Sequence, residues 1–294
     1  MREYCIYLDG LSDDMSKEHI FPTSLGGLDS FCIQADRAFN NNVGSKVDGA
    51  IANDFIMLFK RDRAAAKGHS GTHPEPVARR ATLEDGTPIQ ATFSKNGLRL
   101  YDLKQKRVLD KREWSRTIQV RDLRLDMDAD VRFVAKVALA AGYYAYGELF
   151  KKCVDHSQAR MIVNAERLTD VCPNVRLYTR FQDSESLPDP SDYHLFKTAI
   201  ELSGCSCVLM LPGKDCFGVI VGVLGEFMGM INIPANTADF PNEGAYSLGH
   251  CIFLQEGQVK RISFRHLCDK ISDVMEDIID KKDEGVKRTG NEES

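Results

Sequence analysis

The segment of residues 16–27, Ser-Lys-Glu-His-Ile-Phe-Pro-Thr-Ser-Leu-Gly-Gly, constrains the start of this chain more than any other. Glu18 and His19 place a carboxylate beside an imidazole in a short, partly apolar strand. Pro22 ends that strand because proline has no amide hydrogen to give to a sheet, and the two glycines that follow predict a loop. Polar side chains beside a loop are common in functional sites.

An amide-rich run begins at Asn40, twenty-one residues after His19. It continues through Asn41 and Asn42 into apolar residues that recur at steps of three and four. This spacing predicts an amphipathic helix over residues 43–61, with its apolar side toward the core.

Together, in this order, the two motifs resemble the ββα-metal core of HNH endonucleases, in the branch whose first strand contains Glu-His-Ile-x-Pro followed by Leu-Gly-Gly. The resemblance implies that His19 is the general base, and that Glu18 and Asn40 hold one Mg2+ or Mn2+ ion at the site. It also implies a bend that brings the acid and the imidazole together, since neighbouring side chains of a regular strand point to opposite faces.

Two features depart from the family pattern. The position that orients the base, usually an asparagine, falls near Asp29 and Ser30, with Asn41 and Asp48 as further candidates. Relatives also often carry two Cys-x-x-Cys pairs that bind zinc, but residues 5–8 are Cys-Ile-Tyr-Leu and residues 36–39 are Asp-Arg-Ala-Phe. Because structural zinc takes four nitrogen or sulfur ligands, we expect no structural zinc, with packing of Leu8 and Phe39 in its place. The same loss also permits a degenerate, inactive core.

Charge is unevenly distributed along the chain. The whole protein has a net charge of −5, yet residues 60–124 carry 16 basic and 8 acidic side chains. Beside a nuclease-like core, such a region is where a phosphate backbone would be held. The predicted nucleic-acid-binding residues are Lys60, Arg61, Arg63, Lys104, Lys106 and Arg107. The alternative is a solvated hairpin face without a ligand.

Other features bound the location of the protein. No apolar run approaches the roughly 18 residues that span a bilayer, and the N-terminus does not resemble a signal peptide. The nine cysteines are scattered and odd in number, a pattern typical of reduced thiols. We therefore expect a cytoplasmic protein that makes no membrane contact.

The pattern of elements predicts an α+β fold in four parts. These are an HNH core at 1–62, a small basic antiparallel β region at 63–124, a mixed C-terminal recognition or regulatory domain at 125–281 and a disordered tail at 282–294. Within the second part, Asn96-Gly97 predicts a hairpin. The expected strands are 4–8, 19–21, 30–33, 206–211, 217–224 and 227–233, and further helices are expected over 129–151 and 264–281.

The sequence thus favours a metal-dependent HNH endonuclease that hydrolyses DNA, in the class of bacterial restriction or anti-phage defence effectors. One alternative is a catalytically inactive nucleic-acid-binding protein on a degenerate core. Another is the nuclease subunit of a multi-protein defence complex. DNA is the expected partner, with a second copy of the chain or a partner protein also open.

Overall fold

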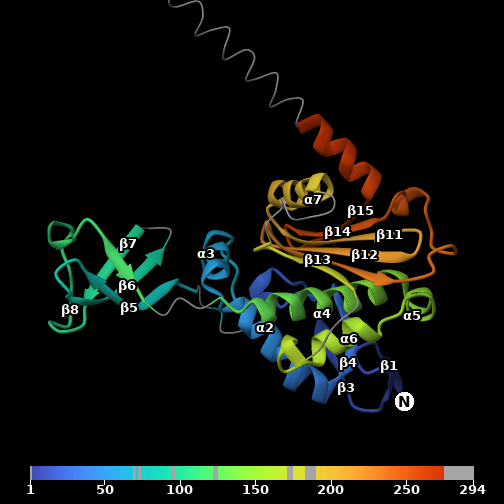
Figure 1. Cartoon of the computed structure of the whole chain (residues 1–294), viewed down its shortest axis with the longest axis horizontal. Helices are drawn as coiled ribbons and strands as arrows, with labels where there is room; N and C mark the ends of the chain where they lie inside the picture. The colour runs from blue at the N-terminus through green and yellow to red at the C-terminus, as the bar shows by residue number, and fades with distance from the viewer. Residues whose placement is uncertain are drawn as a thin grey trace, which may run out of the picture.

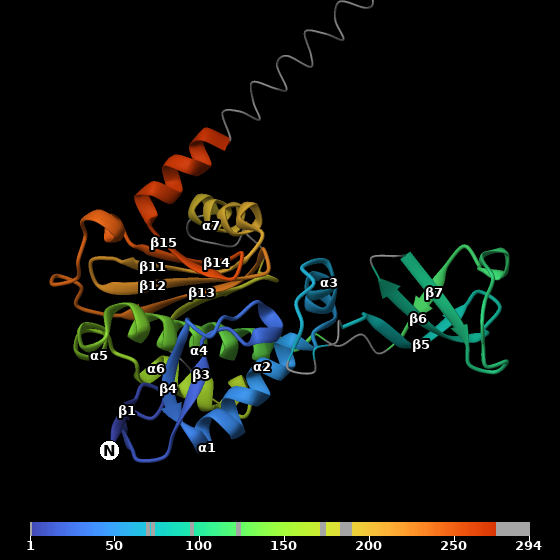
Figure 2. The same cartoon turned by 180° about the vertical axis from the view of Figure 1, so that it is seen from behind.

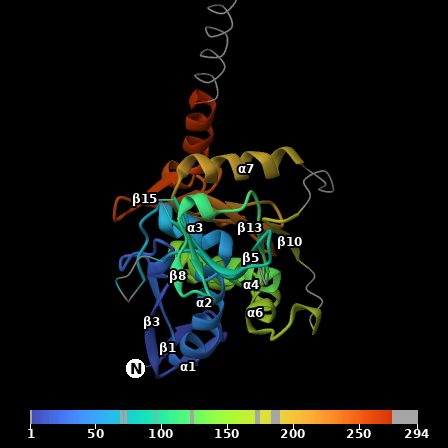
Figure 3. The same cartoon turned by 90° about the vertical axis from the view of Figure 1, so that its left-hand side faces the viewer.

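The computed structural model describes residues 2–68, 71, 74–94, 97–121, 125–170, 175–182 and 190–274. It confirms an α+β fold, built around a six-stranded antiparallel sheet of strand order β10-β13-β12-β11-β14-β15 (Figure 1). Its strands are, in that order, Arg176–Thr179, Glu226–Pro234, Cys216–Val223, Ser206–Pro212, His250–Gln255 and Gln258–Ser263. Helix α4 (Met127–Tyr146) covers one face, and α7 (Pro190–Ser203) covers the other (Figure 3).

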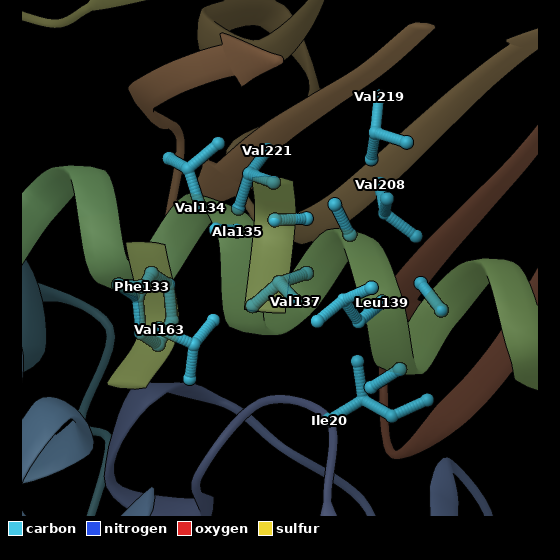
Figure 4. Packing of buried hydrophobic residues seen from close by; sticks show 14 of the residues in the cluster. Ile20, Phe133, Val134, Ala135, Val137, Leu139, Val163, Val208, Val219 and Val221 are labelled. Carbon is cyan, nitrogen blue, oxygen red and sulfur yellow. The ribbon is translucent and has the colours of Figure 1, made fainter. Parts of the chain in front are cut away.

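Helix α4 is the centre of the main core. Asp126 begins it by accepting a hydrogen bond from the Ala129 amide, and every residue from 133 to 142 is buried. A helix that is apolar on all sides must be packed on all sides. In Figure 4 the strands carrying Val208, Val219 and Val221 lie on one side of α4, and Ile20 lies on the other.

The N-terminal part packs on the side of α4 that faces away from the sheet (Figure 2). A hairpin of β1 (Glu3–Cys5) and β2 (Gly10–Ser12) precedes the antiparallel pair β3 (Met15–His19) and β4 (Cys32–Asp36). The prediction of one strand over 4–8 is wrong, since the chain turns after Cys5. The strand expected at 19–21 ends at His19, and the one expected at 30–33 begins at Cys32.

The helix predicted over 43–61 is two helices. A short helix α1 (Arg37–Phe39) and a π-helical segment (Asn40–Gly44) lead into α2 (Ser45–Ala52), and α3 spans Phe55–Arg63. The break occurs because the Asp54 carboxylate accepts a hydrogen bond from the Met57 amide and so begins a new helix.

The basic region forms a separate five-stranded antiparallel sheet of order β8-β7-β6-β5-β9, beyond α3 at one end of the molecule (Figures 1 and 2). Its strands are Arg107–Val108, Gly97–Asp102, Pro88–Ser94, Val77–Leu83 and Ile118–Val120. Ser94 pairs with Gly97, which confirms the predicted hairpin, although Asn96 itself lies outside the described residues. Phe93 packs against Phe55 and Phe59 of α3.

The C-terminal part holds further differences. The helix expected over 129–151 ends at Tyr146, and α5 (Glu148–Cys153) starts after Gly147, whose φ of 54° turns the chain. A third helix, α6, spans Ser157–Asn164. The three predicted strands correspond to β11, β12 and β13. A helix begins at residue 264 as predicted and is described to residue 274, whereas the rest of it and the tail at 282–294 lie outside the described residues.

The hydrophobic clusters do not follow the four predicted parts. Residues of 1–62 and of 125–281 share one cluster, which includes Phe21, Phe31, Val137 and Val219. The 77–120 sheet has a cluster of its own. Residues 1–62, which resemble the HNH core, therefore share one hydrophobic core with the part that contains the six-stranded sheet. Within the described residues, no helix combines the length and apolarity needed to cross a membrane.

A buried imidazole makes the stability of this body sensitive to acid. Burial lowers the pKa of His156 to about 4, from an ordinary 6.5, and the charge of Arg160 acts in the same direction. Below neutral pH the unfolded chain therefore binds a proton at this histidine that the folded chain does not, so the contribution of His156 to stability falls as the pH falls. From pH 7 to pH 5 this decrease is about 2 kcal/mol.

Urea unfolding at both pH values, with the wild type beside His156→Gln, measures this effect. Between pH 7 and pH 5 the stability of the wild type is expected to change less favourably than that of the variant, by about 2 kcal/mol. Asp48 and Asp130, whose raised pKa acts in the opposite sense, titrate in both proteins, so the difference between them isolates His156. Equal pH dependence in the two proteins would contradict the prediction.

Candidate functional site

The end of β3 places Glu18 and His19 on opposite faces. Glu18 is paired with Ile33 and His19 with Cys32 in an unbroken register, so the expected bend at this point is absent. Glu18 is 3% exposed and lies on the inner face, whereas the His19 side chain is 20% exposed. The two side chains consequently have separate surroundings.

On the inner face, Glu18 meets a lysine that comes from α4. The Lys136 ammonium is fully buried and forms ion pairs with Glu18 Oε1 and with Asp48 of α2. Its hydrogen bonds to Asp48 Oδ1 and Oδ2 measure 2.8 and 3.0 Å. Its contact with Glu18 Oε1 is an ion pair.

Lys136 attracts both Glu18 and Asp48, whereas the two carboxylates repel each other. Burial alone would lower the pKa of Lys136, but Asp48 and Glu18 outweigh it and raise that pKa above its usual value. Burial raises the pKa of Asp48 to about 6, against the opposing effect of Lys136. At neutral pH the lysine and the aspartate are therefore both charged.

Asn40 fastens the π-helical segment to the same strand. Its amide nitrogen donates to Ser16 Oγ at 3.1 Å and to the Lys17 carbonyl at 3.2 Å. Its Oδ1 lies 3.3 Å from the point where a Cβ on Gly44 would be, and Glu18 Oε1 lies 3.6 Å from that point. Two oxygen atoms from the predicted metal ligands thus converge beside Gly44.

The metal implied by the resemblance does not fit this arrangement as it stands. Oxygen donors suit Mg2+ or Mn2+. However, the Lys136 ammonium already contacts Glu18 Oε1, and the Cε of Lys136 lies 3.6 Å from the same point beside Gly44. A divalent ion here would face a buried positive charge. Among the described residues, no cluster of three or more His, Cys, Asp or Glu side chains could hold a metal ion.

On the outer face, His19 contacts one of the residues predicted to orient it. His19 Nε2 lies 3.0 Å from Asp29 Oδ1, and Lys17 Nζ lies 2.7 Å from the same oxygen. Two hydrogen bonds lower the pKa of Asp29. The one from Lys17 has the larger effect, and the one from His19 has the smaller. An Nε2–H donated to this carboxylate leaves the lone pair on Nδ1, where the imidazole can accept a proton.

The other orienting candidates lie elsewhere. Ser30 is exposed and accepts a hydrogen bond from the Tyr144 hydroxyl through its carbonyl, at 3.0 Å. Asn41 is exposed. Asp48 is joined to Glu18 by Lys136, on the inner face.

The six predicted nucleic-acid-binding residues divide into two groups. Arg61 is buried and donates to the Ala52 carbonyl at 2.6 Å, while Lys60 pairs with Glu226 and Arg107 with Glu113. Within the described part of the chain, no ion pair engages the remaining three side chains, which are all exposed. These are Arg63, Lys104 and Lys106.

Residues 5–8 and 36–39 stand where relatives carry the cysteine pairs. They pack together through Tyr7 and Phe39, and the predicted role of Leu8 is wrong. Tyr7 stacks on the buried Phe39, with ring centroids 4.2 Å apart, whereas Leu8 is 49% exposed. The Cys5 sulfur accepts a hydrogen bond from the Asp36 amide at 3.4 Å. An aromatic stack therefore joins the two segments.

The sequence interpretation did not single out Lys136. Its signal is a lone charge within the apolar run Phe-Val-Ala-Lys-Val-Ala-Leu of residues 133–139. A lysine in a fully buried helix needs a charged partner. Neither Glu18 nor Asp48 can be identified as that partner from sequence alone, because they lie 118 and 88 residues away.

A scan against protein-family models finds no match to this chain, and searches of curated proteins and of solved structures find no significant one. The likeness to HNH endonucleases accordingly stays a resemblance carried by residues 16–27 and 39–48.

Proposed function

We propose that this protein is a phosphodiester hydrolase that cuts DNA, with His19 as the general base. The observation that carries the proposal is the contact between His19 Nε2 and Asp29 at the end of β3, on the outer face. When His19 Nε2–H donates to Asp29, the free lone pair is on Nδ1, and Nδ1 takes a proton from water. The Asp29 carboxylate then stabilises the imidazolium that forms. The strand pair and the helix that follows supply the ββα order that the resemblance implies.

The divalent ion stays a prediction, and no step of the proposal passes through it. Glu18 has an observed role that does not need a metal, since it is one of the two acids that neutralise Lys136. Asn40 holds the segment before α2 against β3. From the resemblance we further propose a role as a restriction or anti-phage effector, alone or within a complex.

A second candidate function is nucleic-acid binding without catalysis. It is favoured by the Lys136 contact, because an ammonium on Glu18 opposes the binding of a metal ion by that carboxylate. Plasmid nicking separates the two candidates: the wild type should convert supercoiled DNA to open or linear forms, and His19→Ala should not. Binding of DNA without cleavage by the wild type, with Mg2+ or Mn2+ present or absent, would favour the second candidate.

The exposed cations make a separate prediction about DNA binding. Replacing Arg63, Lys104 and Lys106 with alanine should weaken binding equally for all sequences. The slope of log affinity against log salt should fall by about 0.9 for each phosphate group that the variant no longer neutralises. Fluorescence anisotropy over a salt series measures both quantities.

The matched control is Arg107→Ala, because Glu113 already holds that guanidinium, with contacts of 2.5 and 2.8 Å. It should change the slope less than the triple variant does. If the triple variant has the same salt slope as the wild type, then Arg63, Lys104 and Lys106 do not contact DNA.

A further inference from the structure

A hollow of about 260 Å3 opens on the face of the six-stranded sheet that α7 covers. It lies beside the N-terminal turns of α7, which contribute Tyr193 and Phe196. Arg176, Tyr178 and Asn232 line it from the sheet. The valines that pack on α4, such as Val219, lie on the opposite face, so the hollow is separate from the site around Glu18 and His19.

The strand register explains why the sheet is hollow here. Arg176 is paired with Asn232, Asn232 with Gly218 and Gly218 with Leu211, so these residues form one row across four strands. Side chains of such a row project from the same face. Gly218 contributes none, and its φ lies outside the left-handed region, so the backbone does not require glycine there.

The surroundings of Gly218 leave little room for a side chain at this residue. A Cβ at this residue would lie 3.0 Å from Asn232 Oδ1 and 3.5 Å from the Leu211 carbonyl oxygen. A larger side chain at this position would extend into the hollow. Glycine at this point is therefore what keeps the row open.

Several polar groups around the hollow have no partner among the described residues. No hydrogen bond or ion pair engages the Arg176 guanidinium, the Asn232 amide or the hydroxyls of Tyr178 and Tyr193 there. Tyr193 is 5% exposed as a whole residue, and its ring lies against Phe227. Asp192 also lines the hollow but has an interaction of its own. A cation, an amide and two hydroxyls are thus available to a ligand.

We propose that this hollow binds a small anion with a flat aromatic body, such as an aromatic carboxylate or phosphate ester. Arg176 and Asn232 hold the anionic group, because a guanidinium and an amide nitrogen both donate hydrogen bonds to such oxygens. Tyr178 and Phe196 contact the aromatic body. The volume is below the roughly 300–1,000 Å3 of pockets that take drug-sized ligands, so the ligand is small.

Binding of benzoate, phenyl phosphate and the neutral benzamide to the purified chain tests this inference, which does not depend on nuclease activity. Ligand-observed NMR and calorimetry should detect the two anions on the wild type, with benzamide much weaker. Arg176→Gln should weaken the anions at least about tenfold, since a charge-assisted hydrogen bond is removed. Arg79→Gln, an exposed arginine on the other sheet, is the matched control and should bind them as the wild type does.

Gly218→Val is the second variant, since its side chain fills the hollow, and it should bind none of the three probes while circular dichroism shows a folded chain. Because Arg176 is exposed, Arg176→Gln keeps the test decisive even where Gly218→Val fails to fold. The proposal is overturned by a wild type that binds neither anion at millimolar concentration, by benzamide binding as well as benzoate, or by Arg176→Gln binding both anions like the wild type.

Discussion

Lys136→Met is expected to destabilise this protein by about 3–5 kcal/mol, because it removes the only cation in contact with the buried Glu18 and the partly buried Asp48 in this part of the described structure. Methionine keeps most of the apolar stem, so the destabilisation reports the charge more than the volume. Urea unfolding at pH 7 measures it. Lys46→Met on α2 is the matched control: Lys46 is exposed, and its replacement should stay within about 0.5 kcal/mol.

The same variant tests what the ammonium does to cation binding. Without Lys136, Glu18 and Asp48 lose the cation that they share, and Glu18 Oε1 lies with Asn40 Oδ1 beside Gly44. Such oxygen atoms are donors that suit a hard cation. Millimolar Mn2+ should therefore raise the melting temperature of Lys136→Met more than that of the wild type or of Lys46→Met. Equal shifts in all three proteins would show that Lys136 does not compete with a metal ion.

The strands of the main sheet were predictable where the pattern was local. Strands β11, β12 and β13 follow continuous apolar runs, and the Leu224-Gly225 turn joins the last two. The hairpin of β14 and β15 was missed, although Glu256-Gly257 lies between two strand-like runs and both residues have positive φ. Gly257 is the one turn-forming residue at this point, and glutamate is not among the residues typical of two-residue hairpin turns, so the local signal was weaker than at Asn96-Gly97.

The errors in the helices have a different origin. Apolar spacing continues across Asn53 and Asp54 and across Gly147, so periodicity alone predicts uninterrupted helices there. The breaks depend on a side chain that caps a new helix and on a glycine that turns the chain. Gly147 offered a warning, because glycine is a poor residue for a helix interior.

The candidate site was only partly predictable for a physical reason. Glu18, His19, Asn40 and Asp29 are close in sequence, so a motif can group them. The cation that lies beside Glu18 cannot be identified from a local motif. It is Lys136 of α4, and the position of α4 depends on the whole fold. Long-range pairs such as Lys136 with Asp48 are consequences of packing and leave no spacing to recognise.

His19→Ala is expected to lower the rate of DNA cleavage by about 10²–10⁴-fold, which is the usual contribution of a positioned general base. The fold and DNA affinity should not change, because the side chain lies at the end of β3 and, among the residues that the structure describes, its one hydrogen bond is to an exposed aspartate. Plasmid nicking and fluorescence anisotropy measure the two properties separately. His266→Ala, an exposed histidine in the C-terminal helix, is the control and should cut at the wild-type rate.

Asp29→Asn tests whether His19 acts as the general base or has only a structural role. The asparagine can still accept a hydrogen bond from His19 Nε2 but no longer stabilises the imidazolium, so cleavage should slow by less than in His19→Ala. Added imidazole should restore part of the activity of His19→Ala, since it can accept the proton in place of the missing ring, and it should not help Asp29→Asn. Cleavage at the wild-type rate by His19→Ala would place the base elsewhere and remove the HNH-type mechanism from this protein.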